Sequence, residues 1–192
     1  MFQPSLPPIA APVRPLQAVF TAIWPPVILA LLCWWAAGVH YLLFHALAEL
    51  LSIVVALAAM VVASTSLRFA RHHFVVFVSL AIGWCAGLDL IHTLVFKGMQ
   101  LLPGDSADPA TQLWIAARFI QAVALVLSPL LLVRRIHVGW VHAAFGFTAL
   151  VVVTSIGTGH FPTAYVDGQG LTPFKIYTEY LIIAMLGLAL VL

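Results

Sequence analysis

The stretch FVVFVSLAIGWCAGLDLIHTLV, residues 74–95, decides the fold class of this chain. An apolar run of about 17 to 25 residues is long enough to cross the hydrocarbon core of a bilayer as a helix. Five further stretches have a similar length and composition: 16–36, 43–63, 111–133, 138–156 and 174–192. The sequence therefore predicts an all-α, polytopic bundle of about six transmembrane helices.

The composition supports a membrane protein and excludes several other classes. Hydrophobic residues make up 64% of the 192 residues, charged residues only 7%, and the mean hydropathy is +1.12. A soluble domain is about half apolar and a quarter charged, so a water-soluble fold would not hide this much apolar surface. The net charge of +2, with scattered basic residues, gives no footprint for nucleic acid. Cys33 and Cys85 lie in apolar runs and indicate neither a disulfide framework nor a zinc site.

The two ends of the chain differ from the rest. Residues 1–15 contain five prolines and predict a disordered, proline-rich N-terminus before a membrane domain at 16–192. Pro25 and Pro26 predict a kink in the first helix, because each removes a backbone donor. Residues 186–192 read LGLALVL without a polar flank, so we expect the domain to be truncated at its C-terminal end.

The orientation follows from the short loops, because Lys and Arg favour the cytoplasmic side. The basic loop residues fall in alternate loops: Arg14, then Arg68 and Arg71, then Arg134 and Arg135. The intervening loops contain Asp105, Asp108 and Asp167. We therefore expect a cytoplasmic N-terminus and a last helix that runs back towards the cytoplasm.

Polar side chains inside the predicted spans are costly, and each one is therefore a candidate for function. Helical spacing places four groups on single faces: His45 with Glu49, Asp89 with His92, Trp114 with Arg118 and Gln121, and Lys175 with Glu179. With the predicted topology, these groups lie within about two helical turns of the outer surface. The sequence predicts a polar cluster in the outer half of the bundle and a nearly apolar inner half.

Three interpretations of this cluster remain open. The charges almost balance, so they could simply hold helices together. They could also line a cavity, open to the outside, that senses a ligand or an ion. A metal or haem site would use donors from the set His45, Glu49, Asp89 and His92. Arg118 and Lys175 nearby would oppose a cation. A transporter needs a polar path to the cytoplasmic face, which the apolar inner halves do not provide.

Four stretches in order along the chain resemble the third type of bacterial membrane-associated sensor domain, of the MASE family. They are YLLFHALAELLSIVVALA at 41–58, GLDLIHTLVFKGM at 87–99, TQLWIAARFIQAVALVLSP at 111–129 and GQGLTPFKIYTEYLI at 168–182. The resemblance runs from Tyr41 to Ile183. It implies an all-helical input module, facing the extracytoplasmic side, that stands N-terminal to histidine kinases or cyclic di-GMP enzymes.

The resemblance also implies a set of ligand- or signal-sensing residues and no catalytic ones. The family's polar positions map onto His45, Glu49, Asp89, His92, Thr93, Lys97, Gln112, Trp114, Arg118, Thr172, Lys175, Glu179 and Tyr180. Two positions depart from the family, because Thr163 and Ala164 stand where an acidic residue and a cysteine are common. Contacts that depend on those two positions are not expected here.

The sequence therefore predicts a multi-pass sensory input module of a bacterial cytoplasmic (inner) membrane, without enzymatic activity. Its expected partners are the lipid bilayer, a second copy in a full-length parent, and a cytoplasmic effector, either a histidine kinase or a cyclic di-GMP enzyme. No nucleic acid is expected. The cofactor is unknown. The alternative prediction is an intramembrane haem or transition-metal protein that uses His45 and His92.

Overall fold

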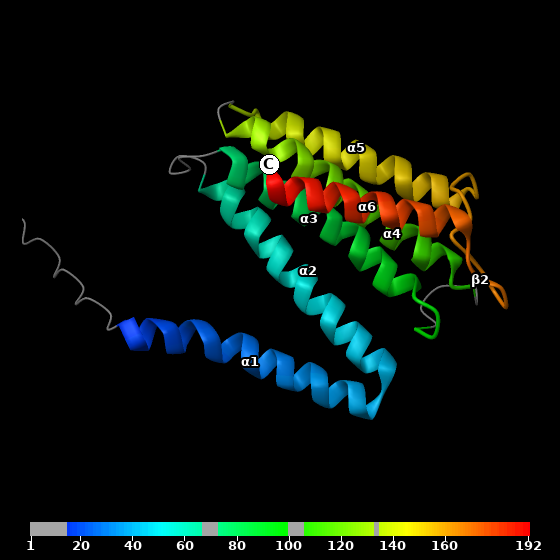
Figure 1. Cartoon of the computed structure of the whole chain (residues 1–192), viewed down its shortest axis with the longest axis horizontal. Coiled ribbons are helices and arrows are strands. Elements are labelled where there is room, and N and C mark those ends of the chain that lie inside the picture. The colour runs from blue at the N-terminus through cyan, green and yellow to red at the C-terminus, as the bar shows by residue number, and fades with distance from the viewer. Residues whose placement is uncertain (1–14, 67–72, 100–105, 133–134) are drawn as a thin grey trace, which may run out of the picture. The chain divides into compact units, whose positions relative to one another are not determined.

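A computed structural model describes residues 15–66, 73–99, 106–132 and 135–192 (Figure 1). The predicted disordered N-terminus lies outside these residues as far as position 14. The same holds for Asp105 and for four of the basic loop residues, Arg14, Arg68, Arg71 and Arg134. By backbone contacts the chain divides into two compact units, residues 1–44 and 45–192.

The described residues form six α-helices, which confirms the predicted all-α class. They are α1 (Pro15–Val39), α2 (Tyr41–Thr65), α3 (His73–Val95), α4 (Asp108–Leu127), α5 (Val138–Gly157) and α6 (Pro173–Val191). A short 3-10 helix, Ser128–Leu131, continues α4. Helices α2 to α6 are long and apolar enough to cross a membrane. In α1 the described apolar part, Ile23–Val39, is shorter than a span.

The first unit contains α1 and the start of α2. Helix α1 continues through Pro25 and Pro26. The backbone N–H of His40 still donates to Ala36 O at 2.9 Å, so the helical bonding reaches past the end of α1. The N–H of Leu42 then donates to Nδ1 of the His40 ring at 3.2 Å, which satisfies one of the donors that a helix start leaves open.

In the second unit, α4 packs between α3 and α6, and α3 also contacts α5. Leu88 of α3 packs with Leu113 and Ala117 of α4 in one buried cluster, which Val152 of α5 covers. Ile115 and Ala122 of α4 pack with Ile182 of α6 in another. Helices in a membrane associate through close packing more than through the hydrophobic effect, so small residues favour these contacts. The alanines of α4 therefore allow its neighbours to approach closely.

Helix α2 is held less extensively than α3 or α4. Its only buried residues are Ile53 and Ala56, which pack against Ala86 of α3. A glycine permits this contact, because a Cβ on Gly83 would lie 2.5 Å from Sδ of Met60. Helix α2 therefore reaches α3 along a narrow seam.

A small β-hairpin between α5 and α6 was not expected from the sequence. Strand β1 (Tyr165–Val166) pairs antiparallel with β2 (Gly170–Leu171), with Tyr165 opposite Leu171. Gly168 in the turn has a φ of 81°, which favours glycine. The hairpin leads directly into Thr172, whose hydroxyl oxygen accepts the N–H of Lys175 at 3.3 Å and caps α6.

Candidate functional site

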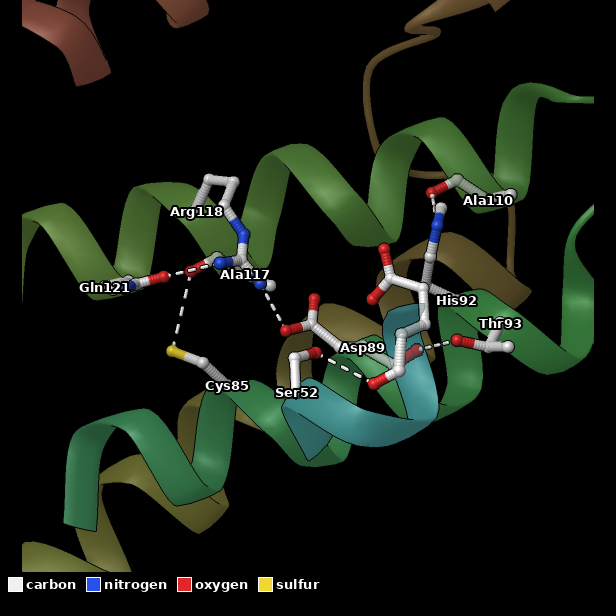
Figure 2. A network of polar contacts seen from close by, with 10 residues as sticks. Ser52, Cys85, Asp89, His92, Thr93, Ala110, Ala117, Arg118 and Gln121 are labelled. Atoms are coloured by element: carbon white, nitrogen blue, oxygen red, sulfur yellow. Dashed lines mark hydrogen bonds and ion pairs between the residues drawn. The ribbon is translucent and has the colours of Figure 1, made fainter. Parts of the chain in front are cut away.

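An ion pair between α3 and α4 forms the centre of the site. Nη2 of Arg118 donates to Oδ2 of Asp89, and Nη1 of Arg118 donates to Oε1 of Gln121 at 2.6 Å (Figure 2). Asp89 is 94% buried, whereas the Arg118 side chain keeps 31% of its surface exposed. Among the described residues, Oδ1 of Asp89 and Nε of Arg118 are buried without a hydrogen-bond partner. This pair is therefore incompletely satisfied within the described residues, which is uncommon for buried polar atoms.

A second polar group joins α2 to α3. His45 and Glu49 lie one turn apart on α2, and His92 comes from α3. One potential ligand atom from each of these three side chains lies within 4.8 Å of the other two. The rings of His45 and His92 meet edge to face, with their centroids 5.6 Å apart. The predicted convergence of these residues is thus seen in the structure.

The His92 ring is held from two sides. Its Nδ1 lies 2.7 Å from the carbonyl oxygen of Ala110, at the start of α4 (Figure 2). A carbonyl can only accept, so Nδ1 carries the proton and donates. Phe96 packs against this ring at 5.8 Å and stacks on His45 at 3.9 Å, measured between ring centroids. The orientation of both imidazoles is therefore fixed by neighbours.

A cavity of about 310 Å³ is lined by the Asp89–Arg118 pair and by Glu49, the one member of the second group that reaches it. Its polar lining comes from α2, α3 and α4: Glu49, Ser52, Cys85, Asp89, Trp114, Arg118 and Gln121. Ser52 donates its hydroxyl to Glu49 O at 2.8 Å, and the Cys85 thiol donates to Ala117 O at 3.5 Å (Figure 2). The volume lies at the lower end of the range for small-molecule sites. Neither Ser52 nor Cys85 stood in the predicted set, since a short polar side chain in an apolar run gives only a weak signal.

The predicted pair on α6 lies next to Trp114. Lys175 is buried and donates to the Glu179 carboxylate one turn away. Its Nζ lies 4.7 Å from the centre of the Trp114 ring, a cation–π contact. Trp114 also lines the cavity, so this residue contacts the α6 pair and belongs to the cavity wall.

The remaining predicted residues do not converge on this cavity. Thr93 donates to the backbone oxygen of Asp89 at 2.8 Å, and Thr172 caps α6. Lys97 forms an ion pair with Asp167 of the hairpin turn at 3.0 Å, about half exposed on both sides. Tyr180 is 65% exposed. These positions shape the ends and surfaces of the bundle.

The loop that connects α5 to α6 is anchored by the start of α4. Oδ1 of Asp108 accepts the N–H groups of Ala164 and Tyr165, both at 2.7 Å. The predicted residue Gln112 donates to Oδ2 of Asp108 at 3.0 Å and to Pro162 O at 3.1 Å. The sequence indicates only that Asp108 belongs to an acidic loop, because nothing in the local sequence shows which distant amides it binds. Ala164, one of the two departures from the family pattern, is fully buried here.

Outside the spans, Asp167 has a perturbed acidity. Hydrogen bonds from Lys97 and Ser106 lower the pKa of the Asp167 carboxyl below its ordinary value of 3.8. The folded state therefore favours the ionised form, and this contribution is lost as the pH falls through the lowered pKa. Because the carboxylate is exposed, salt screens the interaction.

The sequence was compared with models of known protein families, with curated proteins and with solved structures. Residues 37–192 match the family MASE3, described as a membrane-associated sensor domain. Searches of curated proteins and of solved structures return no match. The matched range covers the polar groups of α2, α3, α4 and α6 and leaves out most of α1. Since the match extends over most of its length, the chain belongs to the MASE3 family of membrane-associated sensor domains.

Proposed function

We propose that the chain is a non-catalytic sensory input module of a bacterial inner membrane, and that a stimulus acts on the polar cavity between α2, α3 and α4. The observation that carries this proposal is the position of Glu49, Asp89 and Arg118 around one cavity of about 310 Å³ in a bundle of apolar helices. Ionisable groups at such a depth are costly, and function is the usual reason for keeping them.

A sensor needs two arrangements that differ in affinity for the stimulus. Of the three helices that line the cavity, α2 is the best suited to change, because only its residues Ile53 and Ala56 are buried whereas α3 and α4 are buried along much of their length. It carries His45, Glu49 and Ser52 on the face towards the cluster. A stimulus that contacts both α2 and the Asp89–Arg118 pair favours the docked position of α2 over a looser one.

The output follows from the proposed orientation. With a cytoplasmic N-terminus, the cavity lies in the outer half of the membrane, and α6 runs from the outer hairpin to the cytoplasm. The contact of Lys175 with Trp114 supports α6 as the route, since Trp114 belongs to both the cavity wall and the α6 contact. The expected receiver is a histidine kinase or a cyclic di-GMP enzyme, working as a dimer.

The test is a fusion of the complete chain to a cyclic di-GMP synthase domain, with the cyclic di-GMP level as readout. Glu49→Gln, Asp89→Asn and Arg118→Gln are compared with the matched control Tyr177→Phe, which changes an exposed residue of α6. Coupling between sites is typically worth fivefold or more, so at least one cavity variant should change the output by about that factor.

Membrane insertion of every variant is measured in the same cells by a reporter placed after α6. The proposal is supported if the output changes while insertion stays at the wild-type level and Tyr177→Phe behaves as wild type. Unchanged output in all three cavity variants would mean that the charges only hold the helices together.

A further inference from the structure

The three side chains between α2 and α3 have the composition of a metal-binding set. His45 and His92 offer imidazole nitrogens and Glu49 offers a carboxylate, all within 4.8 Å of one another. Two histidines and one carboxylate bind Zn²⁺ and related first-row ions, with a further position left for water or another ligand. His45 and Glu49 lie four positions apart on one helix, a spacing that lets two side chains reach one ion.

The surroundings of His92 are those of a metal ligand. Its Nδ1 donates to the carbonyl oxygen of Ala110 at 2.7 Å, which leaves Nε2 of the neutral ring with a lone pair. Histidines that bind metals usually make such a bond with the other nitrogen, because it fixes the tautomer and the ring. Phe96 packs against both imidazoles and restricts them further.

The nearby cations do not exclude a metal ion. The charge of Arg118 is balanced by Asp89, and that of Lys175 by Glu179. Within the described residues, no salt bridge includes the Glu49 carboxylate, so this carboxylate can serve as a ligand to a cation. Asp89, the fourth donor expected from the sequence, belongs to the Arg118 pair and lies outside the three-residue set.

We infer that His45, Glu49 and His92 bind one divalent first-row transition-metal ion of the zinc class, between α2 and α3. Ligand bonds of 2.0–2.2 Å in a tetrahedral site put ligand atoms about 3.4 Å apart. The ligand atoms that lie farthest apart therefore have to approach each other by at most about 1.4 Å when an ion binds.

Bound metal would join α2, the least buried of the helices that meet at the cavity, to α3. This inference deepens the proposed function, since it names the ion as the stimulus, and its signalling part rests on that proposal. Metal binding itself is independent of any output and is measured separately.

The binding experiment uses the complete chain, purified in detergent, stripped with a chelator and dialysed against Zn²⁺ or Co²⁺. We expect one Zn²⁺ per chain and visible absorption bands of four- or five-coordinate Co²⁺ that Zn²⁺ abolishes. X-ray absorption of the zinc-loaded wild type should show nitrogen and oxygen ligands without sulfur. This last measurement does not depend on any variant being folded.

The variants His45→Ala, Glu49→Gln and His92→Ala each remove one donor. Loss of a residue that merely supports a ligand costs about 10- to 100-fold in affinity, so loss of a donor should cost at least tenfold. His160→Ala and Asp167→Asn, which change an exposed histidine and an exposed carboxylate, should bind as wild type.

Substoichiometric zinc in the wild type, sulfur ligands, or equal binding by all variants would overturn the inference. A Soret band in the purified protein would overturn it in favour of haem. If zinc binds but the cyclic di-GMP level of the fusion changes neither on addition of zinc nor in the cavity variants, the metal site stands and the sensory role fails. If the cavity variants change the output without zinc binding, the sensory role stands and the metal site fails.

Discussion

Replacement of Asp89 and Arg118 tests whether the ion pair between them stabilises the folded bundle. We consider Asp89→Val, Arg118→Met and the double variant. Arg118→Met leaves a carboxylate that is 94% buried and already has one oxygen without a partner among the described residues. Asp89→Val leaves a guanidinium that keeps 31% exposure and the hydrogen bond to Gln121. The two single variants should therefore differ.

The magnitudes follow from this asymmetry. Breaking a buried pair by removing one partner costs about 3–5 kcal/mol, whereas apolar replacement of both partners is often neutral. We expect about 3 kcal/mol for Arg118→Met. The value for Asp89→Val should be about 1–2 kcal/mol, because Arg118 can still reach polar surroundings. The double variant should lie within about 1 kcal/mol of wild type, which gives a coupling of about 4–5 kcal/mol if the double variant equals wild type.

The assay is reversible unfolding in mixed micelles with increasing SDS, followed by helical circular dichroism. Ser64→Ala is the control, since the Ser64 hydroxyl bonds only to Met60 O of its own helix among the described residues. If the double variant loses as much as the sum of the single variants, the two residues are independent. That result would refute the view that their charges compensate each other.

Three further predictions concern positions around the site. Gly83→Ala should weaken the contact of α2 with α3, because the new Cβ would lie 2.5 Å from Sδ of Met60. Disulfide cross-linking between cysteines placed on the two helices should therefore be slower, and an unchanged cross-linking rate would contradict the close approach. Asp108→Ala removes two acceptor bonds to the hairpin loop and should cost about 2–3 kcal/mol locally, read as faster amide exchange there, with equal exchange as the contrary result. Because hydrogen bonds lower the pKa of Asp167, the turn should be ordered above pH 3.8 and loosen as the pH falls below it; Lys97→Met should abolish much of this dependence, measured with a spin label in the turn.

The helices were predictable because the bilayer imposes a length on them. A span needs about 20 apolar residues, so a run such as 74–95 marks its own ends to within a few residues. The observed α3, His73–Val95, begins one residue earlier. The β-hairpin was missed, since strands of two residues leave no periodic pattern, and only the glycines of its turn hint at it.

The site was predictable in part. Helical spacing places His45 with Glu49 and Asp89 with His92, because residues three or four apart share a face. That these two pairs of residues lie near each other could be inferred only from their similar predicted depth in the membrane. Tyr180, implied by the family resemblance, is 65% exposed, and its role as a sensing residue stays a prediction.

The sequence by itself determined that this chain is a bundle of membrane helices, and it predicted that the ionisable residues within the spans lie near one end. Only the tertiary structure decided that Arg118 pairs with Asp89 and that Glu49 lies beside two histidines. Several acidic and basic side chains at one depth can form many different ion pairs between helices. Their local sequences do not indicate which of these pairs forms. The rotation of each helix and the close approach at small residues select one combination, and these depend on the packing of the whole bundle.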